Sequence, residues 1–215
     1  MSRASPRSST SCGRSPRLRP RRARWAEMAA TTTEAVLVLD MTRDSIAPGA
    51  RALEMRRALL PRVAAYLAWA RGKGMPVVFV CSARRPTDKW FLKYWELVNV
   101  IGTPGLQPIP ELIVQEKDVV VQKRRYSGFF CSDLEITLRE LDVAALQLIG
   151  WSTALAVATT AIDAWQLGFP TTVVSDLTIS HAWGGHTVEE TQKWSLDYIA
   201  AMAKSRIVRS DELMQ

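Results

Sequence analysis

The chain has 215 residues, of which 47% are hydrophobic and 23% are charged, and this composition is typical of one soluble domain with a tail. Its three cysteines are too few and too scattered for a disulfide framework, so we expect a reducing, cytoplasmic setting. The sequence has no apolar run of the roughly 18 residues that a membrane span needs. The net charge of +7 comes from residues 1–27, so a basic nucleic-acid-binding patch on the folded part is not supported.

Residues 1–33 form a basic tail rich in serine, proline and arginine, which we expect to be disordered. Three interpretations of this tail remain open: a transit-type peptide, a nucleic-acid-binding arm, or a product of start-site choice. The third interpretation rests on Met28, which stands just before the first expected element. The folded domain is then expected to cover residues 34–215.

From residue 34 on, short β-branched segments alternate with segments of helical periodicity. The expected strands cover residues 35–40, 76–81, 118–122, 146–150 and 171–175, with a short sixth strand near 206–209. The expected helices cover residues 52–73, 132–141, 152–167 and 187–204. Residues 82–117 form a long connection, and a connection of this length is usually functional. The alternation predicts a parallel sheet with right-handed crossovers and helices on both faces.

In a sheet of this kind the ligand site lies outside the carboxyl ends of the strands. The residues that follow the expected strands are Asp40, 81–85, Lys123, 150–156 and Asp176. Neither GxGxxG nor GxxxxGK[ST] occurs, which disfavours dinucleotide and P-loop nucleotide sites. A carboxylate at the end of an apolar strand suits acid/base work, and a lysine at the same edge can hold it ionised or polarise a substrate oxygen. Considered on its own, Asp40 is also consistent with a residue that caps a helix, and Lys123 is also consistent with a surface residue.

The segment 150–161 begins a helix whose first N–H groups face the expected site, a geometry that stabilises an oxyanion. A nucleophile is expected in such a turn, and its hydroxyl residues there are Ser152 and Thr153. Both also suit the N-terminal cap of the helix, and we favour capping for them.

Four segments together resemble the isochorismatase-like superfamily, also called the cysteine hydrolases. These segments are VLVLDMTRD (36–44), QKRRYSGFFCSDLEITLREL (122–141), GWSTALAVATTAIDAWQLGF (150–169) and SDLTIS (175–180). The resemblance implies a three-layer α/β/α sandwich with a six-stranded parallel sheet, a homo-oligomer (dimer or tetramer), and hydrolysis of a small amide, ureido or vinyl-ether substrate. It implies that Asp40 and Lys123 match the catalytic Asp and Lys of the family.

The same resemblance aligns the nucleophilic cysteine of the family with Ala156, which cannot form a thioester. The usual oxyanion donors map to the backbone N–H groups of Ser152 and Ala156, and a non-proline cis peptide bond maps to Trp151–Ser152. Cys81 and Cys131 do not align with the nucleophile, so we expect them to be buried or incidental. The chain is a Cys-less member by this alignment.

We expect no cofactor and no metal. The metal-binding branch of the family uses an Asp and two His in the loop after the second strand, and SARRPTDKW at 82–90 holds no histidine. The histidines present, His181 and His186, are expected in a lid or an oligomer contact. We expect Trp90, Tyr126, Phe129 and Trp151 to wall a substrate pocket.

Three hypotheses remain open. The first is a natural Cys-less hydrolase, because isochorismatases cleave a vinyl ether and carry glycine at the cysteine position; Asp40 would then act as the acid and Lys123 would orient the substrate. The second is an amidase or ureidase whose cysteine was replaced by Ala156. The third is a non-catalytic binding protein that keeps the pocket.

Overall fold

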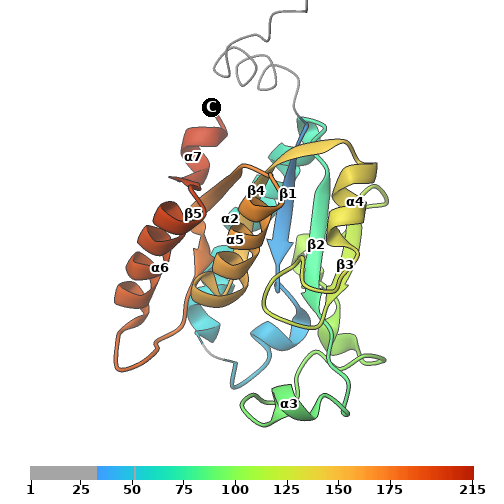
Figure 1. Ribbon diagram of the computed structural model, residues 1–215, viewed down its shortest axis with the longest axis vertical. Helices are drawn as coiled ribbons and strands as arrows, with labels where there is room; N and C mark the ends of the chain where they lie inside the picture. The colour runs from blue at the N-terminus through green and yellow to red at the C-terminus, as the bar shows by residue number, and fades with distance from the viewer. Residues whose placement is uncertain (1–32, 51) are drawn as a thin grey trace, which may run out of the picture. The chain divides into compact units, whose positions relative to one another are not determined.

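The computed structural model describes residues 33–50 and 52–215, so the expected tail lies outside the described residues except for Thr33, which opens the first strand. Six parallel strands form one sheet in the order β3-β2-β1-β4-β5-β6 (Figure 1). The strands are β1 (Thr33–Leu39), β2 (Val77–Ser82), β3 (Val119–Lys123), β4 (Val143–Trp151), β5 (Thr171–Ile179) and β6 (Arg206–Val208). The predicted six-stranded parallel sheet is confirmed.

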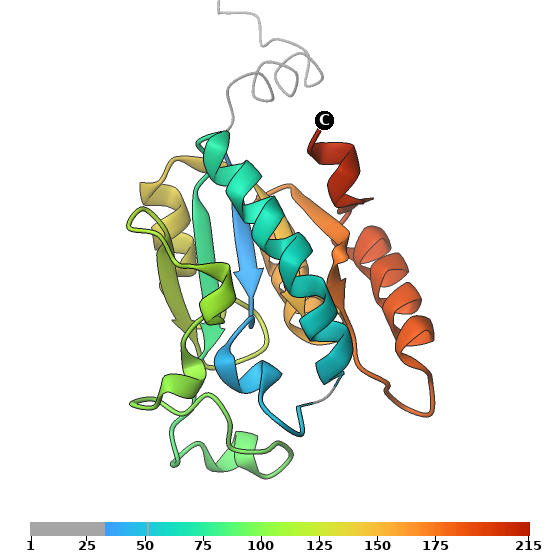
Figure 2. The ribbon, with the colours of Figure 1, turned by 180° about the vertical axis from the view of Figure 1, so that it is seen from behind.

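Helices cover both faces of the sheet. The face toward the viewer in Figure 1 carries α4 (Leu134–Glu140), α5 (Ala158–Gln166) and α6 (Val188–Met202). The opposite face, turned forward in Figure 2, carries the long α2 (Leu53–Gly72). The short C-terminal α7 (Ser210–Leu213) contacts β5, and its Leu213 packs with the core on the α2 side. This arrangement confirms the three layers expected from the strand–helix alternation.

The strands alternate their side chains between two apolar cores, as the period of two in a β-strand requires. Leu37 and Leu39 of β1 belong to the core under α4, α5 and α6, whereas Val36 and Val38 belong to the core under α2. A strand that is buried on both faces reads as a continuous apolar run, which is why the β1 segment was readable from the sequence.

Two strands, β4 and β5, are longer than expected from the sequence by four residues each. β4 begins at Val143, where small alanines gave no strand signal, and runs to Trp151. β5 continues past an irregularity in its pairing with β4 and ends at Ile179, so Thr178 pairs with Gly150. The extension carries the chain to Ser180 and His181 at the carboxyl edge of the sheet.

Two other segments also differ from expectation. The helix expected from residue 152 begins as a π-helical turn, η4 (Thr153–Val157), before α5. The long connection after β2, in which no individual element was predicted, contains α3 (Lys89–Leu92) and the single 3-10 turns η2 (Pro104–Leu106) and η3 (Pro110–Leu112). A further 3-10 turn, η1 (Arg43–Ile46), follows β1.

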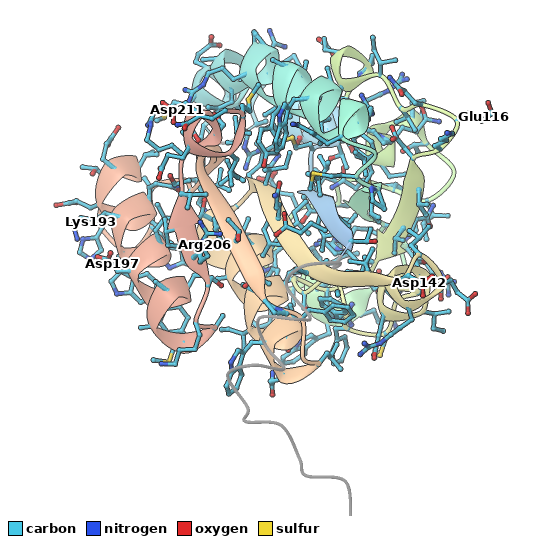
Figure 3. All side chains as sticks on the ribbon, turned by 90° about the horizontal axis from the view of Figure 1, so that it is seen from above. Glu116, Asp142, Lys193, Asp197, Arg206 and Asp211 are labelled. Carbon is cyan, nitrogen blue, oxygen red and sulfur yellow. The ribbon has the colours of Figure 1, made fainter. Side chains whose placement is uncertain are left out.

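Charged side chains are concentrated at the periphery of the described domain. Figure 3 labels six of them, and Lys193 and Asp197 of α6 point outward there as an exposed ion pair with 2.7 Å between Nζ and Oδ2. Across residues 33–50 and 52–215, no helix combines the length and the apolar content needed to cross a membrane.

Candidate active site

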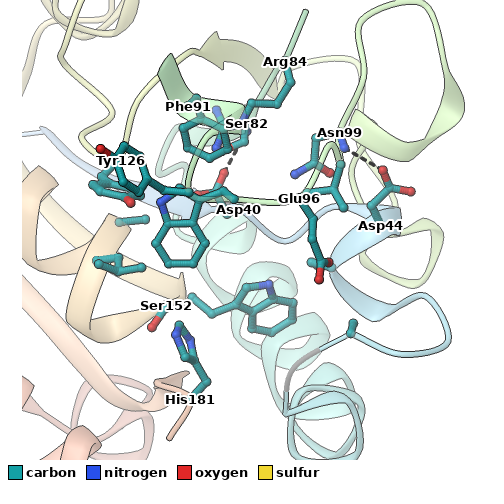
Figure 4. Close-up of a pocket in the computed structure, with 18 of the residues that line it drawn as sticks. Asp40, Asp44, Ser82, Arg84, Phe91, Glu96, Asn99, Tyr126, Ser152 and His181 are labelled. Atoms are coloured by element: carbon teal, nitrogen blue, oxygen red, sulfur yellow. Dashed lines mark hydrogen bonds between the residues drawn. The ribbon is translucent and has the colours of Figure 1, made fainter. Parts of the chain in front are cut away.

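A cavity of about 530 Å³ opens at the carboxyl ends of the strands (Figure 4). Its wall combines the ends of β1, β2 and β4 with the connection after β2 and with His181 after β5. The predicted residues Asp40, Tyr126, Trp151, Ser152 and Ala156 all line it. This position is the one that the parallel topology predicts for a ligand site.

Asp40 occupies the first position after β1, where the backbone turns out of the sheet with φ of 53°. Aspartate adopts this left-handed conformation more readily than most residues with a Cβ atom. Its Oδ1 accepts a hydrogen bond of 2.8 Å from the backbone N–H of Ser82, the last residue of β2. The carboxylate is thus anchored on the neighbouring strand, and its side chain keeps 18% exposure on the cavity side.

Lys123 is the last residue of β3 and its side chain is 1% exposed. It points inward because Val121, two residues earlier, faces the same core. Its Nζ donates to Asp40 Oδ2 at 2.6 Å, to Ser82 Oγ at 3.2 Å and to the carbonyl of Arg125 at 3.0 Å. Burial lowers the pKa of Lys123, and the Asp40 carboxylate partly opposes that effect. The structure therefore brings Asp40 and Lys123 together as one hydrogen-bonded ion pair.

The turn after β4 forms the opposite wall. The Trp151–Ser152 peptide bond is cis, which confirms that prediction. Ala156 lies in η4 with 2% exposure, and its methyl group is part of the cavity lining. The expected capping by Ser152 and Thr153 is wrong: neither makes a side-chain cap, and among the described residues neither hydroxyl has a hydrogen-bond partner. Ser180 Oγ instead accepts from the backbone N–H of Ala154 at 3.1 Å.

Two of the four predicted aromatic walls do not reach the cavity. Tyr126 and Trp151 line it, but Trp90 is 68% exposed and packs edge-to-face against Tyr94, with 5.4 Å between ring centroids. Phe129 stacks on Phe169 at 6.0 Å within the core under α4 and α5. An aromatic residue gives the same sequence signal in a core, on a surface and in a pocket, so the sequence alone did not separate these cases.

Besides Tyr94, two aromatic residues that the sequence analysis did not place in the cavity are Phe91 and Trp95. Both belong to the connection after β2, and both line the cavity. Trp95 contacts Tyr126 edge-to-face at 6.0 Å and Trp183 at 5.7 Å between ring centroids. The long connection therefore meets the loop after β5 through tryptophan contacts. In the sequence, the length and the tryptophan content of the connection were the features that indicated a wall of the cavity here.

Ser82 and Arg84 are polar residues of the site to which the sequence gave no role, although both belong to the segment 81–85 placed at this edge. Both are buried and line the cavity. Arg84 Nη2 donates to Ser82 Oγ at 3.3 Å, and Nη1 donates to the carbonyl of Arg124 at 3.1 Å. Ser82 thus joins Asp40, Lys123 and Arg84 in one hydrogen-bonded group.

The remaining candidate residues take other positions. His181 lines the cavity, whereas His186 is exposed beside Glu190, and the lid or oligomer contact expected for them stays a prediction. Asp176 is not a cavity residue, because its carboxylate accepts hydrogen bonds from Ser210 of α7. In the part of the chain that the structure describes, no three His, Cys, Asp or Glu side chains gather as metal ligands.

The cysteines of the described domain lie outside the cavity lining. Cys81 is buried in the α2-side core, and burial together with the Asp40 charge raises its pKa to about 12. Cys131 is exposed. A buried thiol with a raised pKa is a poor nucleophile near neutral pH.

Comparison with known proteins gives consistent results. Residues 34–208 match the isochorismatase domain. The ureidoacrylate amidohydrolase of Variovorax paradoxus is 28% identical over 164 residues, which cover 64% of this chain and 62% of that protein. The chain therefore spans less than two thirds of the length of that relative.

Solved structures agree with the fold. An isochorismatase-like hydrolase from Alkaliphilus metalliredigens superposes with a TM-score of 0.77 at 30% identity, covering 86% of this chain and 98% of that one. The N-carbamoylsarcosine amidase of Thermoplasma acidophilum superposes with a TM-score of 0.72 at 26% identity, covering 84% and 98%.

Proposed function

Because this chain belongs to the isochorismatase family, we propose that it hydrolyses a small molecule in the cavity at the carboxyl ends of its strands, without a covalent cysteine intermediate. One observation carries the proposal: Asp40 and Ala156 line the same cavity, and Asp40 is paired with the buried Lys123. Asp40 and Lys123 would supply the acid/base pair, whereas Ala156, the position that the resemblance matches to the nucleophile, holds only a methyl group. We extend the proposal to a homo-oligomer in the cytoplasm.

We assign the proton transfer of the proposed reaction to the Asp40–Lys123 pair. Lys123 donates along a 2.6 Å hydrogen bond, and burial lowers the pKa of its ammonium group, which favours release of a proton to a neighbouring acceptor. Each carboxylate oxygen has two lone pairs, of which Ser82 and Lys123 each use one. Asp40 therefore still has lone pairs with which to exchange a proton with a substrate or a water molecule.

For a vinyl-ether substrate, the proposed reaction begins when protonated Asp40 transfers its proton to the terminal vinyl carbon. The double-bond electrons form the new C–H bond and leave an oxocarbenium centre. Water then adds to this centre and returns one proton to the Asp40–Lys123 pair. The resulting hemiketal breaks its C–O bond to give a carbonyl compound and an alcohol, so the net reaction consumes one water molecule. Ala156 leaves room for the attacking water.

A second candidate is an amidase in which alanine has replaced the catalytic cysteine. The names of two relatives favour it, since one is a ureidoacrylate amidohydrolase and the other an N-carbamoylsarcosine amidase. In that case the cavity lacks the thiolate that attacks the carbonyl carbon. The backbone N–H groups of Ser152 and Ala156 would serve as the oxyanion donors.

A side-by-side hydrolysis screen of the unmodified chain and Ala156→Cys separates these candidates. The panel holds isochorismate, small primary amides and small ureido compounds, and the readouts are product formation and ammonia release. Ala154→Cys is the matched control, because it places a thiol in the same turn but outside the cavity lining. We expect turnover of a vinyl ether by the unmodified chain. Ammonia release by Ala156→Cys alone supports the second candidate, and no turnover by any variant contradicts both and favours a binding protein.

A further inference from the structure

Arg84 places a positive charge in the cavity wall that no carboxylate of the described domain balances at close range. The residue is 5% exposed, and it makes no ion pair within 4.0 Å with any acid in residues 33–50 or 52–215. Its guanidinium carbon lies 3.8 Å from the centroid of the Phe91 ring. A buried charge is costly unless a partner of opposite sign compensates it.

The two carboxylates that act electrostatically on Arg84 are already engaged by other cations. Asp40 is bonded to Lys123 at 2.6 Å, and Asp88 forms a hydrogen-bonded ion pair with Arg124. Of the two further acids that line the cavity, Asp44 accepts the backbone N–H of Asn99 at 2.6 Å, and Glu96 is exposed. The buried part of the wall therefore has an excess of positive charge at Arg84.

The hydrogen bonds of the guanidinium are also incomplete. Its two recorded bonds, to Ser82 Oγ and to the Arg124 carbonyl, use two of the five N–H groups of an arginine, and its buried Nε has no partner. Two other buried donors of the same cavity, Trp151 Nε1 and Ser152 Oγ, also lack a partner among the described residues. A buried polar group without a partner costs free energy, so this wall is suited to a ligand rich in acceptors.

We propose that the substrate carries a carboxylate group and that Arg84 binds it. A carboxylate is an acceptor only, has the opposite charge, and fits the fork of a guanidinium with two parallel hydrogen bonds. This inference deepens the proposed function, since it names the class of substrate for the same cavity. It assigns Arg84 a substrate-binding role, next to but separate from the Asp40–Lys123 pair.

The test is a calorimetric titration with benzoate and benzamide, two planar probes of similar shape that differ in charge. The aromatic side chains Phe91, Trp95, Tyr126 and Trp151 line the cavity and suit such rings. We expect the unmodified chain to bind benzoate at least about tenfold more tightly than benzamide, as a charge-assisted hydrogen bond predicts. Arg84→Gln should remove this preference. The exposed Arg85→Gln, one residue away, is the matched control and should keep it.

Equal binding of the two probes by the unmodified chain overturns the proposal, even if Arg84→Gln does not fold. A folded Arg84→Gln that keeps the preference for benzoate overturns it as well, because Arg84 would then have only a structural role. The titration needs no turnover, so its outcome is independent of the hydrolysis screen. If the chain prefers benzoate through Arg84 but shows no turnover, the carboxylate-binding role of Arg84 stands and the proposed function is contradicted. If the chain shows turnover but no preference for benzoate, the proposed function stands and this inference is contradicted.

Discussion

Lys123 Nζ lies 2.6 Å from Asp40 Oδ2, although the two residues are 83 positions apart and lie at the ends of strands that do not pair with each other. The strand between them supplies the link, since Ser82 at the end of β2 donates its N–H to Asp40 and accepts from Lys123. Three consecutive strand ends thus hold one carboxylate and one ammonium group in a fixed position. An ion pair mounted on strand ends needs little reorganisation when a substrate binds.

Gly150 of β4 allows the close approach of β1 that positions Asp40. Its φ is 114°, and a Cβ atom there would lie 2.1 Å from the carbonyl oxygen of Leu39. We expect Gly150→Ala to lower the free energy of unfolding by about 3 kcal/mol or more, because backbone atoms have to move. Gly168→Ala is the control: its φ of 84° adds strain of about 1 kcal/mol, but nothing lies within 4 Å. Urea unfolding of both variants measures the difference, and equal losses would contradict the close-packing argument.

Asp176 binds the N-terminal end of α7 through hydrogen bonds to Ser210. Its carboxylate accepts the backbone N–H of Ser210 at 2.7 Å and the hydroxyl of Ser210 at 2.8 Å, and it pairs with Arg62. Burial alone would raise the pKa of Asp176, but these hydrogen bonds and the Arg62 charge lower it below the ordinary 3.8. We expect Asp176→Asn to lower the free energy of unfolding by about 2 kcal/mol near neutral pH.

The pH dependence provides the check on Asp176. A depressed folded-state pKa means that its stabilisation is present above pH 3.8 and is lost as the pH falls through the folded pKa. The deficit of Asp176→Asn should therefore shrink toward zero in acid, as measured by urea unfolding against pH. Asp197→Asn, at an exposed ion pair with Lys193, should show almost no deficit. A deficit of Asp176→Asn that is constant with pH would argue against this assignment.

Cys81 is expected to behave as an inert core thiol. Burial and the Asp40 charge raise its pKa from 9.0 to about 12, so iodoacetamide should modify exposed Cys131 but not Cys81 near neutral pH, as peptide mass spectrometry can read out. Between pH 9 and 12 only the unfolded thiol ionises, so stability should fall with rising pH by up to about 1.4 kcal/mol per unit. Cys81→Ala should not show this loss of stability between pH 9 and 12. Rapid labelling of Cys81 in the folded protein would contradict the assignment.

Much of the fold was predictable because its strands are apolar runs that need no knowledge of distant contacts. Asp40 and Lys123 were identified for the same reason, since each ends such a run and the topology places both at one edge. The limits of β4 and β5 were not predictable, because they depend on pairing between the strands. Gly150 pairs with Thr178 only after an irregularity that no local pattern encodes.

The parts of the site that the sequence missed depend on three-dimensional contacts in the long connection. Arg84 reaches the cavity because its backbone pairs with residues near Asn99 and its side chain lies over Phe91. Trp90 and Trp95 belong to the same short stretch, yet only Trp95 lines the cavity. Helical or strand periodicity cannot separate such residues, because this stretch has no long regular element.

The measurement that tests the central claim most directly is the turnover of the hydrolysis panel by the unmodified chain and by Asp40→Asn. Asparagine tolerates the positive φ at this position and keeps an oxygen for the Ser82 N–H, but it cannot exchange a proton as a carboxylate does. We predict hydrolysis by the unmodified chain and a rate about 10² to 10⁴ lower in Asp40→Asn, with circular dichroism confirming that the variant is folded. Hydrolysis at an unchanged rate by folded Asp40→Asn would contradict the account.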